Sequence, residues 1–142
     1  MANIIPYAFR GELFTGTHNF ASGGDSFKLA LYTANPYTTA STVYSATTEV
    51  SSAGGSNYTT TGNALTGNAV AASTAVASCD FNDTERTSAT FTAAFGAIYN
   101  DDQSDKLCVV LDFSGDKTAT NGTFKITFPN PATPADAIIS MA

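Results

Sequence analysis

The sequence contains no tryptophan and a single histidine, and only 13% of its 142 residues are charged. The six cations are spread along a chain with a net charge of -6, which argues against a surface that binds phosphate. No run approaches the roughly 20 apolar residues of a membrane-spanning helix. The N-terminus lacks the charged segment and long apolar core of a secretory signal. We therefore expect a soluble protein, made in the cytoplasm, that binds neither nucleic acid nor membrane.

Catalytic motifs are also missing. We find no Gly-x-Ser-x-Gly turn, phosphate-binding loop, His-Glu-x-x-His pair or Cys-x-x-Cys pair. A lone histidine such as His18 is most often a hydrogen-bonded turn residue. The sequence therefore predicts no enzyme and no cofactor, and a small hydrolase is the least favoured function.

An acidic turn contains Asp101, Asp102 and Asp105. Carboxylate oxygens suit Ca²⁺, but the turn lacks the spacing and the distal glutamate of a calcium-binding loop. A solvated turn is favoured, and a bound cation stays the open alternative.

Two cysteines, Cys79 and Cys108, each lie in a strand-like run of apolar or small residues. Cysteine packs as a small hydrophobic residue, so two buried free thiols are favoured. A disulfide between them remains possible, because two cysteines alone do not define the redox compartment.

The chain is rich in Thr, Ser, Ala, Gly and aromatic residues, which favours strands and turns. The clearest strand lies within residues 25–34, where apolar residues alternate with others. Because successive strand side chains face opposite sides of a sheet, this segment has one strongly apolar face. That face consists of Phe27, Leu29 and Leu31, and the other of Lys28, Ala30 and Tyr32.

Further strands are indicated by alternation between turn residues. The expected ranges are 58–65 and 68–77 as a hairpin, then 78–81, 89–99, 106–113, 123–128, 137–141 and, weakly, 47–50. In 89–99 the alternation predicts one shared face, formed by Ala89, Phe91, Ala93, Phe95, Ala97 and Tyr99. Gly96 in this strand suggests a bulge or a close backbone approach. Short strands without intervening helices predict an all-β antiparallel sandwich, in one domain and possibly jelly-roll-like.

The N-terminal part differs from the rest. Residues 2–7 read as an extended arm, because Pro6 biases the preceding residue away from helix. Residues 8–20 carry apolar residues at helical spacing, with Gly16 as a possible stop. We expect residues 1–20 to form an arm and a short helix, and residues 21–142 to form the sandwich domain.

Six aromatic residues in weakly patterned segments leave two interpretations open. They could form a carbohydrate-binding platform, or pack at sheet edges and at a subunit contact, which is favoured. They are Tyr7, Phe9, Phe14, Tyr37, Tyr44 and Tyr58.

A series of strand and turn segments extends along the chain: residues 12–20, which read ELFTGTHNF, 25–33, 58–62, 89–100, 110–117, 122–129 and the ending at 137–139. Together these segments resemble small virion proteins of tailed bacteriophages, in particular capsid decoration (cement) proteins. The resemblance covers nearly the whole chain but contains no catalytic signature.

The resemblance implies a β-sandwich on the capsid exterior, often a trimer, that binds the major capsid protein. An arm able to add to a neighbour's sheet edge is compatible with this function. The expected contact segment is 1–20, with candidate interface residues Ile4, Ile5, Tyr7, Phe9 and Phe14. The alternatives are a tail, neck or baseplate protein, and a carbohydrate-binding sandwich.

Overall fold

A computed structural model describes residues 2–73, 75–129 and 137–141. Within them the chain forms one α-helix, seven strands and one 3₁₀ turn. In chain order these are α1 (Tyr7–Phe14), β1 (Phe27–Tyr32), β2 (Asn63–Ala64), β3 (Ala69–Ala72), β4 (Ala77–Asp80), β5 (Thr84–Asn100), η1 (Asp101–Gln103), β6 (Lys106–Ile126) and β7 (Ile139–Met141).

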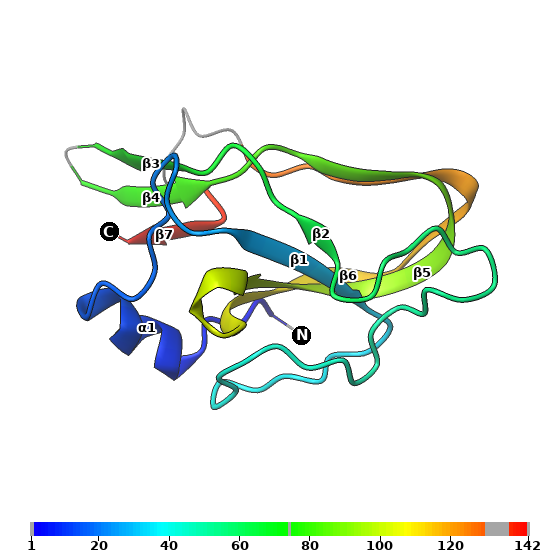
Figure 1. Ribbon diagram of the computed structural model, residues 1–142, viewed down its shortest axis with the longest axis horizontal. Coiled ribbons are helices and arrows are strands. Elements are labelled where there is room, and N and C mark those ends of the chain that lie inside the picture. The colour runs from blue at the N-terminus through cyan, green and yellow to red at the C-terminus, as the bar shows by residue number, and fades with distance from the viewer. Residues whose placement is uncertain (1, 74, 130–136, 142) are drawn as a thin grey trace.

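The strands form two antiparallel sheets that pack against each other, which confirms the predicted sandwich (Figure 1). One sheet has the order β2-β1-β5-β6 and the other β3-β4-β7. The described strands thus form sheets of four and three, whereas a jelly roll has eight strands in two sheets.

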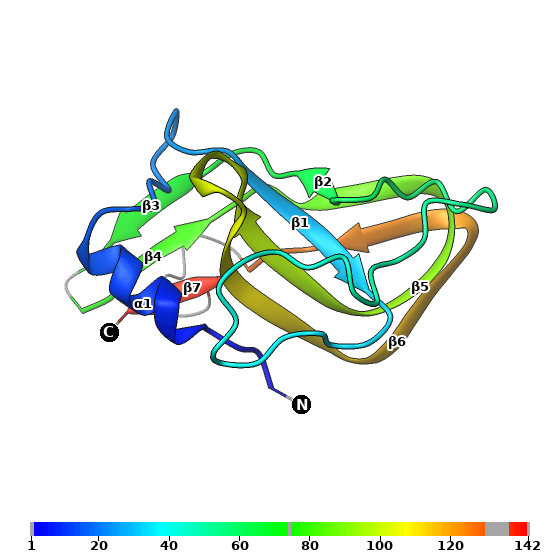
Figure 2. The same ribbon diagram turned by 60° about the horizontal axis from the view of Figure 1, so that its bottom comes forward.

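The longest element is the hairpin of β5 and β6, which connects the two layers. Both strands bend midway, so that one half of each strand lies in one layer and the other half lies in the second layer (Figures 1 and 2). Register shifts occur along the pair, and the largest lies between Ala93↔Lys117 and Phe95↔Asp112. There the β6 segment 113–116 has no opposite partner, and such a bulge bends a strand and increases its twist.

This bulge corrects two sequence-based expectations. Ala89, Phe91 and Ala93 face the inner core, but Ala97 and Tyr99 belong to a cluster on the opposite side of the sheet. The expected shared face is therefore wrong, because the irregular register reverses the alternation. The separate strands expected at 106–113 and 123–128 are both parts of β6, apart from the last two residues.

The alternation expected for β1 is confirmed. Phe27, Leu29 and Leu31 enter the inner core, while Ala30 and Tyr32 lie in the cluster on the other face.

The expected hairpin of 58–65 with 68–77 is wrong. β2 pairs with β1, and β3 pairs with β4. Gly62 explains part of this arrangement, because at its φ of +83° a Cβ would lie 2.0 Å from the Leu29 carbonyl oxygen. The chain therefore passes directly against β1 at a position that only glycine fits. The weak strand expected at 47–50 is a turn with one isolated bridge, Tyr32↔Glu49.

The predicted helix exists but is shorter than residues 8–20. It ends at Phe14, and Gly16 follows with a φ of +69° and donates its N–H to the Leu13 carbonyl. This left-handed glycine is the usual helix stop, as expected. Phe9 on the helix and Phe20 after it belong to the same core as the strands, so the N-terminal segment packs within the sandwich.

Two apolar clusters lie on opposite faces of the four-stranded sheet. The inner cluster fills the space between the sheets and is dominated by phenylalanine. The outer cluster is tyrosine-rich and is covered by the connection from β1 to β2 (Figure 1). Within the described part of the chain, no helix has the length and apolar character to cross a membrane.

Candidate functional site

The five candidate interface residues lie in different environments. Tyr7 and Phe14 are exposed, with 61% and 93% of their surface accessible, whereas Phe9 is fully buried in its own chain. Ile4 is half-buried and pairs with β6 through two backbone hydrogen bonds to Val110, of 2.9 and 2.8 Å. The arm thus extends its own sheet, and the Phe9 ring is not available to a partner.

Ile5, the fifth candidate, lines an apolar groove between α1 and β7. The groove has a volume of about 360 Å³ and also contacts Phe9, Leu13 and Phe14 on the helix side. On the strand side it is lined by Ile139, Ser140 and Met141. This feature brings together the two ends of the described chain, so no local sequence pattern indicates it.

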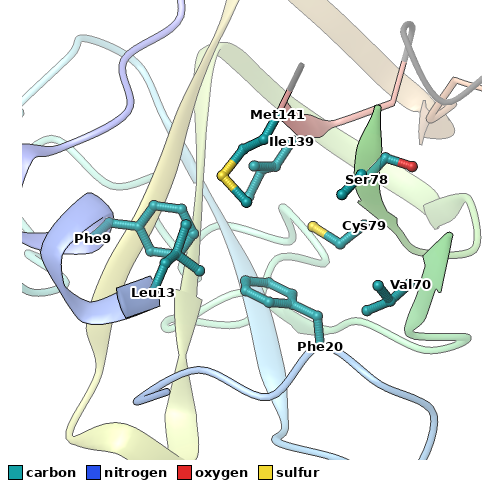
Figure 3. Close-up of a pocket in the computed structure, with 9 residues that line it drawn as sticks. Phe9, Leu13, Phe20, Val70, Ser78, Cys79, Ile139 and Met141 are labelled. Atoms are coloured by element: carbon teal, nitrogen blue, oxygen red, sulfur yellow. The ribbon is translucent and has the colours of Figure 1, made fainter. Parts of the chain in front are cut away.

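A second, smaller cavity of about 160 Å³ adjoins the groove beneath α1 (Figure 3). The two spaces share four lining residues: Phe9, Leu13, Ile139 and Met141. Phe20, Val70, Ala77, Ser78 and Cys79 complete the wall of the inner cavity. Figure 3 shows both sulfur atoms, of Cys79 and Met141, on the cavity side, while the Ser78 hydroxyl points away from it.

One cation borders this apolar surface. Arg10 lines the outer groove, where its guanidinium donates to the Ile5 carbonyl over 3.1 Å and lies 5.3 Å from the centre of the Tyr7 ring. Among the described residues no carboxylate pairs with Arg10. The partners that the described residues give to its guanidinium at the mouth of the groove are therefore uncharged.

A polar cluster lies on the other side of α1, centred on His18. Glu12 accepts from Lys106 Nζ over 2.5 Å and from His18 Nε2 over 2.8 Å. The buried Asn100 side chain donates to His18 Nδ1 over 3.0 Å and to Asp25 over 2.8 Å. The expectation that His18 is a hydrogen-bonded residue is confirmed, and the cluster attaches α1 to the β5–β6 turn.

The carboxylates of this cluster are held in their charged form. Burial alone would raise the pKa of Glu12, but the hydrogen bonds from Lys106 and His18 outweigh it and lower the pKa. For Asp25, burial is likewise outweighed by hydrogen bonds from the Asn19 backbone and the Asn100 side chain, so its pKa is also lowered. Both carboxylates therefore contribute stability as anions.

Cys108, His18 and Glu12 superficially resemble a cysteine–histidine–carboxylate triad, because Cys108 Sγ lies 4.0 Å from His18 Nδ1. Nδ1 already accepts from Asn100, so it is not free to take the thiol proton. The thiol is fully buried, and burial raises its pKa well above the ordinary value. A thiol that is neutral and shielded from solvent is not a nucleophile, so this arrangement is structural.

Cys79 and Cys108 are both buried and free, as favoured from the sequence. Burial raises the pKa of Cys79 to about 12, so this thiol is also unreactive near neutral pH.

The acidic turn lies at the tip of the β5–β6 hairpin, where the carboxylates of Asp101 and Asp102 and the backbone carbonyl of Asp105 make structural contacts. Asp101 pairs with Lys28 over 2.9 Å, and Asp102 accepts from the Ser26 backbone over 2.7 Å. In the described part of the chain, no group of three or more His, Cys, Asp or Glu side chains is placed to hold a metal ion.

The carbohydrate-binding platform, the less favoured interpretation of the six aromatic residues, does not form one surface. Phe9, Tyr37 and Tyr58 are buried, and Tyr44 is half-buried. Of the six aromatics, Tyr7 and Phe14 remain exposed, and both belong to α1. The apolar surface around α1, formed by Tyr7, Phe14, Met141 and the groove, is therefore the candidate site; we call it the α1 surface.

Comparisons with known proteins give no assignment: no family model, no curated protein and no solved structure matches this chain.

Proposed function

We propose that the protein is a non-enzymatic structural component of a tailed-phage virion, which binds the outer surface of the capsid shell and associates with copies of itself, as a trimer. The virion assignment comes from the resemblance of the sequence to capsid decoration proteins. The major capsid protein is the proposed partner, and the capsid exterior is the proposed location.

The exposure of Phe14 is the observation that carries a binding function. This ring is 93% accessible although the chain has ample core in which to bury aromatics. Tyr7 lies seven residues earlier on the same helix, a spacing that places both on one face. Met141, 57% exposed, lines the groove together with Phe14. Contiguous exposed apolar surface with aromatic residues is typical of protein interfaces.

The state of the candidate nucleophile also supports a non-enzymatic function. The one cysteine near a histidine is buried and neutral, and among the described residues that line the groove none but Arg10 is titratable. What the α1 surface offers is apolar area and a single positive charge. That composition fits binding to another surface better than bond-breaking chemistry.

The test is co-sedimentation with expanded empty phage heads, preceded by light scattering to measure the mass of the free protein. Phe14→Ser should weaken head binding about tenfold or more, because an exposed aromatic anchor contributes on the order of 2 kcal/mol to an interface. Val43→Ser is the matched control, since Val43 is 48% exposed but does not belong to the α1 surface. If the wild-type protein does not sediment with heads, capsid decoration is wrong.

Point variants are a sharper test than removal of the arm. Deleting residues 1–7 would also remove the Ile4 pairing with β6 and the buried Pro6. A loss of binding would then have two explanations. Phe14→Ser leaves the core and the sheet intact.

A further inference from the structure

We propose that the groove and the cavity beneath α1 form a binding site for a single-chain amphiphile with an anionic head, an alkyl carboxylate. The apolar chain occupies the cavity and the groove, and the carboxylate meets Arg10. This site goes beyond the proposed capsid function and does not depend on it.

The inner cavity fits an apolar group rather than water. It has a volume of about 160 Å³ and is partly open, and its lining is almost entirely apolar, as is typical of ligand sites. A water molecule needs polar partners, yet the walls are almost entirely carbon and sulfur, and the Ser78 hydroxyl points away (Figure 3). Filling this space would restore packing contacts that its lining side chains lack.

The connection to the outer groove defines the shape of the ligand. The cavity and the groove share Phe9, Leu13, Ile139 and Met141, so they adjoin, and the proposed apolar path runs past these side chains from the cavity to the groove beside Phe14. Ligand sites are typically concave and mostly apolar, with a few polar groups that fix orientation. A linear hydrocarbon chain matches this path. A peptide would place backbone groups against the inner walls, where they would find few hydrogen-bond partners.

Arg10 defines the head group. Among the residues that the structure describes, it is the one charged residue that lines the path, and no carboxylate there neutralises it. The nearest acid along α1, Glu12, is already paired with Lys106 and His18. A guanidinium at the mouth of an apolar path is complementary to a carboxylate.

Decanoate is the probe, titrated calorimetrically into the purified full chain, with decanol as the uncharged comparison. We expect saturable binding of one decanoate per chain and weaker binding of decanol. The chain has two methionines, so methyl-labelled protein gives at most two methionine signals, and that of Met141 should shift on binding. No saturation, or adsorption of many molecules per chain, would overturn the site.

Two variants separate the parts of the site. Arg10→Gln should weaken decanoate binding about threefold to fivefold, as for an exposed ion pair, and leave decanol binding unchanged. Lys117→Gln removes a charge outside the groove and should have no effect. If Arg10→Gln changes nothing, the anionic head group is wrong.

Ala77→Leu fills the inner cavity and should weaken both ligands at least tenfold. If that variant does not fold, Val70→Phe enlarges a cavity-lining residue that is 58% exposed and so better tolerates a larger side chain. Unchanged binding in a folded cavity variant would overturn the site. If decanoate fails to bind but heads still bind through the α1 surface, the groove belongs to the protein partner and the capsid proposal stands.

Discussion

The two faces of the four-stranded sheet bury their apolar residues by different means. The inner face uses phenylalanine rings in direct contact: Phe20 stacks on Phe27 at 4.3 Å, and Phe27 meets Phe81 edge-on at 5.5 Å. The outer face uses tyrosines, whose rings pack while their hydroxyls bond to the covering segment. Tyr32 and Tyr37 share a hydrogen bond of 2.7 Å, and Tyr32 also donates to the Ser45 carbonyl over 2.9 Å.

The difference follows from what covers each face. A second sheet satisfies its own backbone groups, so the inner core needs only apolar contact. An irregular segment has free N–H and C=O groups, and tyrosine can bury a ring and satisfy such a group at once. Glu49 completes this solution, because it accepts from Tyr44, Tyr58 and the Thr61 backbone. The outer cluster therefore combines packed tyrosine rings with a network of hydrogen bonds.

Alkaline pH should disrupt the outer cluster, and we expect it to lower the stability of the folded chain more than any substitution proposed below. Burial raises the pKa values of four tyrosines in or against the outer cluster, Tyr32, Tyr37, Tyr44 and Tyr99. It also raises that of Tyr58, which belongs to the inner cluster but shares Glu49 with Tyr44. Because their pKa values are higher in the folded state, their stabilisation is complete below pH 10, the ordinary tyrosine value, and is lost as the pH rises above it. Phenolate absorbance should therefore appear together with the loss of structure followed by circular dichroism. Gradual ionisation in a chain that stays folded would contradict this.

Phe27→Ala should cost the most among single substitutions, about 3–5 kcal/mol of the free energy of unfolding. The ring is 1% exposed and contacts both Phe20 and Phe81, so truncation leaves a cavity between the sheets. Urea denaturation measures the loss. A cost below about 1 kcal/mol would show that the inner core is not tightly packed.

Tyr58→Phe tests the connection between the two faces. The Tyr58 hydroxyl accepts from the Leu31 N–H over 2.9 Å and donates to Glu49 over 2.7 Å. Its removal leaves a buried strand N–H without this partner, which should cost about 1–3 kcal/mol by thermal denaturation. Tyr7→Phe is the matched control, and its cost should be near zero because Tyr7 is exposed.

Glu12→Gln should have the smallest effect, about 1 kcal/mol at neutral pH, because the ion pair it breaks is partly exposed. The pKa of Glu12 lies below its ordinary value of 4.5 in the folded protein. Its contribution is therefore present above pH 4.5 and is lost as the pH falls through the lower folded value. The difference in unfolding free energy between wild type and variant should shrink on acidification. A constant difference would mean that the Glu12 charge is not involved.

The sequence predicted elements whose signal is local. Strict alternation placed β1 and both of its faces, and Gly16 marked the end of α1. The face reversal in β5 could not be predicted, because it depends on how many residues β6 inserts opposite Ala93 and Phe95. Gly96 was the one residue whose local pattern indicated an irregularity in β5. A Cβ there would come within 3.1 Å of the Phe113 and Leu29 side chains, so the space is filled by side chains and not by the close backbone approach that was expected. The alternative, a bulge, lies nearby, between Ala93 and Phe95.

The candidate site was predictable only in part. The apolar spacing in residues 8–20 indicated a helix with exposed and buried aromatics, but not which of Phe9 and Phe14 is buried. That choice depends on the position of α1 against β6 and β7. The groove requires Leu13 and Ile139 to meet across nearly the whole chain, and no periodicity encodes such a contact.

The bent hairpin has a consequence for how the chain folds. The short turn at Asp101–Gln103 joins β5 to β6, so pairing these two strands closes only a small loop. Once it has formed, this hairpin already contains a part of both layers. We expect it to act as an early template to which β1 adds by pairing with β5, with its central amides protected first in pulse-labelled hydrogen exchange. Assembly then needs no separate step in which two finished sheets meet.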